Sequence, residues 1–400
     1  MPATHFFARN PEEIGLDSEK VHALFERAER EVKSGLLPAT QVAIARNGKI
    51  GAMQTFGTAV QGGTEKPATD ETRFVIMSST KAFTSASAWI LMQEGKLRPE
   101  DRVVDYIPEF GTNGKDVVTV EQLLIHTSAI PYAPHWQKEW ADPDRRLARF
   151  AQWKPDHTPG EKFVYHVSAN FWPVAAIVEQ LSGQRLSEFV RTRIAEPLGL
   201  PDLRFGLPPS GNADVADVEW VGEAPTAEEY EKLGVKGFNA TTNAINEDGV
   251  LELNETVTRE AGSPSAGCIT TAGDIALFYQ ALLNDGHAHN GTPVWQPEML
   301  KEARRVRTGE LRDPFLGHRA NRALGIAVAG GDGKANLRGF GRTNSAESFG
   351  HPGFGGQSGW ADPATGISFG FLTNGFDRHD IREARRRVAL SSLAASCAAT

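Results

Sequence analysis

The stretch FVIMSSTKAFTS, residues 74–85, joins a polar segment to a long apolar run and predicts the start of a buried helix. Ser78 and Lys81 are three residues apart, so a helix places both side chains on one face. If the helix begins at about residue 79, Ser78 lies at its N-terminus, where free N–H groups and the helix dipole favour a developing oxyanion. A serine hydroxyl is a good nucleophile only when a base takes its proton. Alone, Ser-x-x-Lys is common, and Ser78 could equally be a plain N-cap.

The segments on either side predict β structure at both chain ends and helices between them. Residues 17–34 have helical apolar spacing, and Asn47-Gly48 is a type I′ hairpin signal between two strands. A second hairpin turns at residues 362–366, and residues 381–395 form a last helix. The apolar run at 80–94 is the first of several helices in the middle. We therefore expect an α/β (α+β) protein, with an antiparallel sheet flanked by helices and a separate all-helical domain.

The same pattern predicts the domain boundaries. Residues 1–76 and 260–400 should form the sheet domain from both chain ends, and residues 77–206 a mainly helical domain. Residues 207–259 are rich in Pro, Gly and acidic residues, so we expect a long loop excursion near the active site.

Composition narrows the partners and the compartment. The net charge of −8 argues against nucleic-acid binding, which would require a basic surface. No apolar run approaches the ~20 residues that span a bilayer, and the N-terminus has no signal-peptide pattern. Cys268 and Cys397 are the only cysteines, and free thiols fit a reducing compartment. We expect a cytoplasmic protein with neither a nucleic-acid nor a membrane partner; the sequence predicts no oligomeric state.

Two further stretches bear on the role of Ser78. PGEKFVYHVSAN, residues 159–170, carries Tyr165 just ahead of a predicted helix. FGHPGFGGQSGWADP, residues 349–363, holds five glycines ahead of a strand, and glycine lets a ligand approach the backbone closely. The alternatives are that Tyr165 is a core residue with a satisfied hydroxyl and that the second stretch is a glycine-rich hairpin without a role in chemistry.

Together, these motifs resemble those of the serine β-lactamase and penicillin-binding-protein superfamily. FVIMSSTK is similar to its Ser-x-x-Lys motif, residues 165–167 (Tyr-His-Val) to its Tyr-x-Asn motif, and residues 351–353 (His-Pro-Gly) to its Lys-Thr-Gly motif. Val167 replaces the Asn that contacts a substrate amide, and His351 replaces the Lys that helps to bind a carboxylate. Within the superfamily, the chain is therefore most similar to the family VIII carboxylesterases, where His-x-Gly is common.

The resemblance implies a role for each site residue. Ser78 would be the nucleophile, Tyr165 the general base, and Lys81 the group that keeps Tyr165 ionised. The backbone N–H groups of Ser78 and Phe354 would form the oxyanion hole. The residues expected to contact the substrate are His351, Gly353, Val167, Tyr132 and Trp360. Ser79 and Thr80 are expected to be spacers, and His126 a structural histidine with satisfied nitrogens.

The expected activity is that of a carboxylesterase, a serine hydrolase that acts on small-molecule esters through an acyl-enzyme. The alternatives are a β-lactamase or D,D-peptidase, an acyltransferase, and a catalytically silent penicillin-binding-like module. The α/β-hydrolase signature Gly-x-Ser-x-Gly is absent from the sequence. No cofactor is expected, and no metal, because His287 and His289 lie in a polar turn without the further ligands that zinc requires.

Overall fold

The computed structural model describes residues 1–232 and 247–399. Its main sheet has the strand order β3-β2-β1-β11-β10-β9-β8, and each neighbouring pair is antiparallel. Both chain ends supply strands, namely β1 (Ala39–Arg46), β2 (Lys49–Gln61) and β3 (Thr64–Pro67), and β8 (Ala327–Val328), β9 (Phe349–Gly350), β10 (Ser358–Asp362) and β11 (Ile367–Thr373). The predicted fold class, an antiparallel sheet accompanied by helices, is confirmed. The domain boundaries remain a prediction.

The two predicted hairpins form the centre of this sheet. Asn47 and Gly48 have φ values of 54° and 76°, the left-handed pair that a type I′ turn between β1 and β2 requires. Gly366, with φ of 71°, closes the turn between β10 and β11. Strands β1 and β11 then pair directly, with Val42 opposite Phe371, so the N- and C-terminal parts of the chain meet in mid-sheet.

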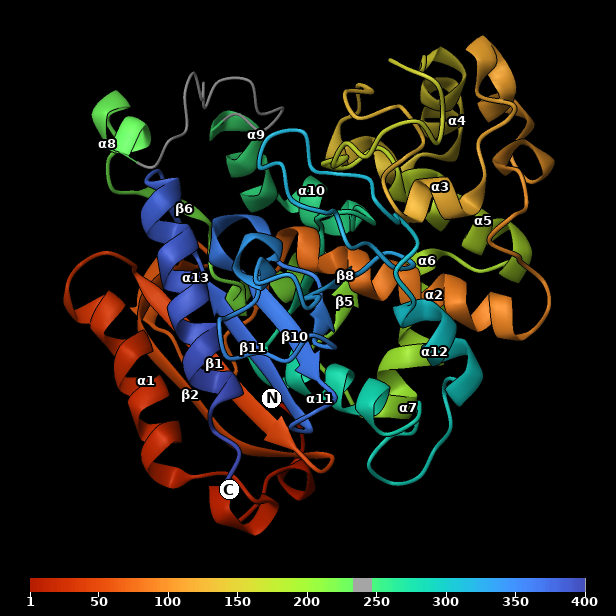
Figure 1. Cartoon of the computed structure of the whole chain (residues 1–400). Coiled ribbons are helices and arrows are strands. Elements are labelled where there is room, and N and C mark those ends of the chain that lie inside the picture. Colours follow the sequence, from red (N-terminus) through yellow and green to blue (C-terminus); the bar gives the residue numbers. More distant parts are fainter. Residues whose placement is uncertain (233–246, 400) are drawn as a thin grey trace.

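Helices cover both faces of the sheet. On one face, α1 (Ser18–Lys33) and α13 (Asp380–Ala395) pack against each other, and α11 (Ala272–Leu283) covers the opposite face (Figure 1). Asp17 caps α1 by accepting from the N–H groups of the first turn. Because successive side chains of a strand point to opposite faces, Val42 packs in the cluster under α1 and α13 while Ala43 packs in the cluster that contains α11.

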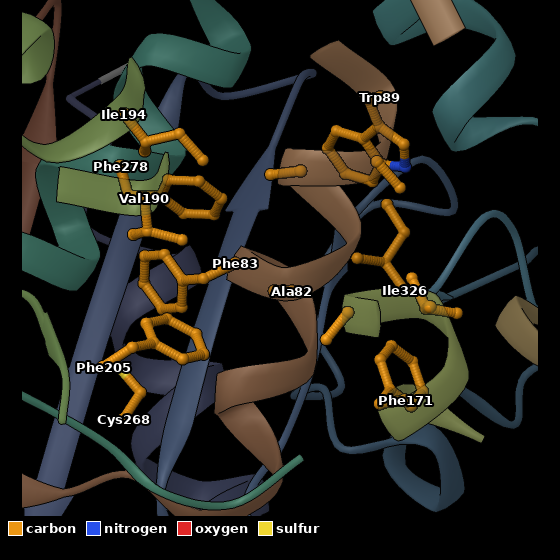
Figure 2. Packing of buried hydrophobic residues seen from close by; sticks show 14 of the residues in the cluster. Ala82, Phe83, Trp89, Phe171, Val190, Ile194, Phe205, Cys268, Phe278 and Ile326 are labelled. Atoms are coloured by element: carbon orange, nitrogen blue, oxygen red, sulfur yellow. The ribbon is translucent and has the colours of Figure 1, made fainter. Parts of the chain in front are cut away.

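The helix that follows the opening motif, α2 (Thr80–Gln93), is buried along most of its length. Phe83 points toward Phe205 and Phe278 on one side, while Ile326 and Phe171 lie on the other (Figure 2). Three helices pack directly against α2, namely α5 (Phe171–Ser182), α6 (Leu186–Val190) and α12 (Pro297–Arg304). The other helices of this region are α3 (Val120–Leu124), α4 (Pro143–Gln152) and α7 (Glu196–Leu198). Close packing on all sides fixes the position of the N-terminus of α2 and hence of Ser78.

The remaining strands and helices are short. A three-stranded sheet of β4 (Phe74–Val75), β7 (Cys268–Thr270) and β5 (Arg204–Phe205) leads into α2. The stretch predicted as a long loop excursion, residues 207–259, contains β6 (Glu219–Val221), α8 (Ala227–Lys232), α9 (Glu247–Leu251) and the start of α10 (Thr256–Ala261). Strand β6 pairs in parallel with β12 (Gly375–Asp377). Residues 233–246 of that stretch lie outside the described residues.

Two general features follow from the described residues. Cys268 and Cys397 are free thiols, and both are buried. None of the described helices has the length and apolar character needed to cross a bilayer.

Candidate active site

Ser78 lies on a tight turn between β4 and α2. Residues 77–79 form a single 3-10 turn, and α2 begins at Thr80. Met77 has φ of +49°, a left-handed conformation that costs a non-glycine residue about 1–3 kcal/mol. The side chain of Ser78 is thereby held at the N-terminal end of α2, where the residue remains 9% exposed.

Lys81 is fully buried beside Ser78. Its Nζ lies 2.9 Å from Ser78 Oγ, 2.7 Å from the carbonyl oxygen of Val167 and 3.0 Å from that of Ser265. Burial, assisted by the charge of Arg322, lowers the pKa of Lys81 well below its ordinary 10.5, which favours the uncharged amine. The two carbonyls can only accept, so they take the two N–H groups of that amine. In the structure the contact with Ser78 also runs from Nζ to Oγ; when the amine is uncharged, only the hydroxyl of Ser78 can donate to its lone pair, because the two carbonyls can only accept.

Tyr165 completes the group. The Nζ of Lys81 lies 5.5 Å from the centre of its ring, and the side chain of Tyr165 interacts with Ser78. Burial raises the pKa of Tyr165 above 10.0, although Arg322 and the interaction with Ser78 act in the opposite direction. The structure thus brings Ser78, Lys81 and Tyr165 together, with the phenol protonated in the resting state.

The segment that carries Tyr165 is held by buried histidines. His166 Nε2 accepts from the N–H of Ile130 at 3.0 Å, so its Nδ1 carries the proton and donates to the carbonyl of Val164 at 2.6 Å. Burial lowers the pKa of His166 to about 3, which keeps the ring neutral. His126 stacks on Tyr165 with ring centres 4.6 Å apart, and its Nδ1 accepts from the N–H of His166. Its Nε2 is buried without a partner, so the prediction of a fully satisfied histidine was wrong.

The third motif packs on the opposite side of the nucleophile turn. Ser79 Oγ donates to the carbonyl of His351 at 2.9 Å, and Thr80 Oγ1 accepts from the N–H of Cys268 at 3.2 Å. Both hydroxyls therefore hold neighbouring segments against α2, and the prediction that they are spacers was wrong. Burial lowers the pKa of His351 well below 6.5, so this imidazole is neutral and supplies no cation where the resemblance would place a lysine.

The two N–H groups expected to form the oxyanion hole belong to Ser78 and Phe354. Within the part of the chain that the structure describes, neither the N–H of Ser78 nor that of Phe354 donates to a protein acceptor. These are the two groups expected to bind an oxyanion, and that role remains a prediction.

The other residues expected at the site differ in their positions. Val167 contributes its carbonyl to Lys81. Tyr132 is 61% exposed and takes part in none of the hydrogen bonds recorded around Ser78 among the described residues. Trp360 is 1% exposed, packs on Phe369 and donates from Nε1 to Ser391 on α13. The structure thus places Trp360 in the core between the sheet and α13 and does not bring it to the site.

Arg322 is a neighbour that the sequence gave no reason to place here. Its Cζ lies 5.3 Å from the ring centre of Tyr165, and its Nε and Nη1 are buried without hydrogen-bond partners. It belongs to no recognisable motif, and only the packing of distant segments brings it to Tyr165.

The described residues offer no alternative site of comparable chemistry. No three described His, Cys, Asp or Glu side chains gather closely enough to hold a metal ion. Two cavities of about 660 and 650 Å³ lie away from Ser78, one lined by residues of α1 and α13 such as Glu31 and Arg386 and the other by residues between Gly330 and Ala346.

Comparison with known proteins identifies the family and the fold of the chain. A family model described as beta-lactamase matches residues 25–394. An esterase/beta-lactamase of Mycobacterium tuberculosis is 26% identical over 308 residues, which is 75% of this chain and 68% of that protein. A penicillin-binding protein homologue from Caulobacter crescentus has a similar structure, with a TM-score of 0.76 and 26% identity over 95% of this chain and 99% of that one. A family VIII carboxylesterase has a TM-score of 0.75 at 24% identity, with 95% and 99% covered. The chain therefore belongs to the β-lactamase family, and its fold is that of the serine β-lactamases and penicillin-binding proteins.

Proposed function

We propose that this protein is a carboxylesterase that cleaves small-molecule esters through an acyl-enzyme on Ser78. The observation that carries the proposal is the 2.9 Å contact between Ser78 Oγ and the Nζ of Lys81, a buried amine whose pKa is lowered well below its ordinary value by burial. A buried amine with a free lone pair is a competent base for a neighbouring hydroxyl. The position of Ser78 at the start of a helix adds favourable electrostatics for a developing oxyanion.

In the proposed acylation, Ser78 Oγ attacks the ester carbonyl and its proton passes to the Nζ of Lys81. The carbonyl oxygen becomes an oxyanion between the N–H groups of Ser78 and Phe354. When the intermediate collapses, Tyr165 gives its phenolic proton to the departing alkoxide, and the proton on Lys81 restores the phenol. The sequence suggested an ionised Tyr165 as the first base; the raised pKa of Tyr165 and the lowered pKa of Lys81 favour Lys81 for that step.

Deacylation uses the same groups in reverse. Water takes the place of the alcohol, and Tyr165 together with Lys81 removes its proton as it attacks the acyl carbonyl. The proton then returns to Ser78 Oγ as the acid leaves. An alcohol in place of water would give transesterification, which is the acyltransferase alternative.

The preference for esters rests on what surrounds the reacting groups. Val167 has no side-chain amide to bond a peptide or β-lactam substrate, and the imidazole of His351 is neutral. A substrate carboxylate binds less favourably beside this neutral imidazole than beside a lysine. The binding of a neutral ester does not depend on a cation at this position. The names of the similar proteins include both esterase and β-lactamase, so the residues of this chain have to decide between them.

The test compares substrates on one purified enzyme. We expect a higher kcat/KM for p-nitrophenyl butyrate than for nitrocefin, and a graded series of p-nitrophenyl esters gives the acyl preference. A higher kcat/KM for nitrocefin would contradict the proposal in favour of a β-lactamase. Product transfer that rises with added alcohol would reveal an acyltransferase. No acylation of Ser78 by an ester, a phosphonate or a penicillin would indicate a silent module.

A further inference from the structure

The guanidinium of Arg322 lies over the ring of Tyr165 and has no counterion among the described residues. No described residue forms an ion pair or a side-chain hydrogen bond with it, and its Nε and Nη1 are buried. Arg322 is half-buried, and its charge is only partly solvated because Nε and Nη1 are shielded from water. The nearest aromatic faces are those of Tyr165, 5.3 Å from Cζ, and Phe163, 5.8 Å from it.

The backbone holds Arg322 in this place. The carbonyl of Arg322 accepts from the N–H of Arg307 at 2.8 Å, and its N–H donates to Thr308 Oγ1 at 3.0 Å. Its position is thus fixed by main-chain bonds that a change of side chain leaves intact. A substitution that removes the charge of Arg322 therefore leaves these two backbone hydrogen bonds in place.

We propose that Arg322 is a positioning residue whose unpaired guanidinium keeps Lys81 uncharged and stabilises the Tyr165 phenolate that forms as the alcohol leaves. The inference rests on the proposed function of Ser78, Lys81 and Tyr165. A neighbouring cation disfavours a second positive charge and favours a negative one. The guanidinium of Arg322 therefore disfavours the protonated form of Lys81 and favours the phenolate form of Tyr165. Its contact with the face of the tyrosine ring strengthens when that ring becomes anionic.

The other charged and titratable groups around the pair do not duplicate this role. His126, His166 and His351 have pKa values lowered by burial, so they stay neutral in the range where esterases are assayed. Arg338 is bound to Asp332. Asp313 accepts from backbone N–H groups and acts on the charge of Arg322 without a hydrogen bond to it. Arg387 on α13 acts on Tyr165 more weakly than Arg322 does. Arg322 is therefore the cation to remove.

The experiment measures kcat/KM for p-nitrophenyl butyrate against pH in wild type, Arg322→Met and Arg322→Lys. Loss of the cation raises the pKa of both Lys81 and Tyr165, so both limbs of the profile should move to higher pH in Arg322→Met, by about 1 unit. At the pH of the wild-type acid limb, this is about a tenfold loss of kcat/KM. Arg322→Lys keeps the charge and should retain limbs close to those of wild type.

Two controls make the result decisive. The tyrosinate absorbance that is lost on Tyr165→Phe reports the ionisation of Tyr165 directly, and it should also move to higher pH in Arg322→Met. Fluorophosphonate labelling of Ser78 in every variant shows that the proposed nucleophile is intact. Labelled Ser78 with unmoved limbs and unmoved tyrosinate titration would overturn the role of Arg322 and leave the proposed function standing.

A different outcome would assign Arg322 to the substrate. If Arg322→Met raises KM only for esters with a carboxylate on the acyl chain and leaves the pH limbs in place, Arg322 binds anionic substrates and the positioning role is wrong. If wild-type Ser78 is not labelled at all, the proposed function itself fails.

Discussion

A Cβ atom on Gly353 would lie 2.6 Å from the carbonyl oxygen of Ile76, closer than real Cβ atoms approach such an atom. The third motif is therefore in direct backbone contact with the turn that presents Ser78. Only glycine permits this approach, which also places the N–H of the next residue, Phe354, near Ser78. A hydrogen bond from Ser79 Oγ to the carbonyl of His351 supports the same contact.

Substitution of Gly353 by Ala should push these two segments apart. We expect at least a tenfold loss of kcat/KM and a decrease of about 1–3 kcal/mol in the free energy of unfolding, as overpacking in a close-packed interior usually costs. Gly331→Ala is the matched control, because a Cβ there would meet only the Cβ of Ala346 at an ordinary 3.8 Å. Full activity and stability in Gly353→Ala would show that this contact does not support the site.

Ser78→Ala should abolish ester hydrolysis and leave the fold intact. Loss of a nucleophile costs on the order of 10³-fold or more in kcat. The hydroxyl of Ser78 interacts with the side chains of Lys81 and Tyr165, and neither contact is a helix cap. The free energy of unfolding should change by about 1 kcal/mol or less in thermal or denaturant unfolding. Residual activity above a tenth of wild type would remove Ser78 from the proposed role.

Tyr165→Phe should be nearly inactive because it removes the proton that the departing alkoxide needs. General acid catalysis contributes on the order of 10²–10⁴-fold, so kcat should fall within that range. The ring still packs between His126 and His351, whose ring centres lie 4.6 and 6.1 Å away, so stability should be almost unchanged. An ester with a p-nitrophenolate leaving group needs less protonation and should lose less than an alkyl ester. Equal retention of most activity on both would contradict the role of Tyr165.

Asp274, in the first turn of α11, should make stability depend on pH. Burial, with the nearby charge of Asp202, raises its pKa to about 7. Between the unfolded value of about 3.9 and this folded value, the native state binds the extra proton, so stability decreases as pH rises through that window. Asp274→Asn stays neutral and should gain on the order of 1–3 kcal/mol relative to wild type between about pH 5 and about pH 8. A pH-independent difference in urea unfolding would show that Asp274 is already ionised at the lower pH.

Much of this fold follows from local sequence signals. Asn47-Gly48 specifies its turn because both residues adopt left-handed φ, and Ser-x-x-Lys specifies one face of one helix. The identity of the family was also predictable, because three short motifs occur in order with their local surroundings. These features depend on neighbours in the chain, which is why the sequence alone reveals them.

The residues whose roles were predicted wrongly or missed have partners that lie far away in the sequence. Trp360 was expected at the site, but all of β10 is buried, so its pattern does not show which face of the sheet the indole occupies. Ser79 and Thr80 were expected to be spacers, and their partners, His351 and Cys268, are far away in the sequence. Arg322 had no motif at all, since its charge matters only through the packing of its segment against Tyr165.

The most direct test of the account is covalent labelling of the intact protein with a fluorophosphonate, followed by mass spectrometry of its peptides. The account predicts a single adduct on Ser78 in the wild-type protein and none in Ser78→Ala. An adduct on another residue, or labelling that persists in Ser78→Ala, would contradict it.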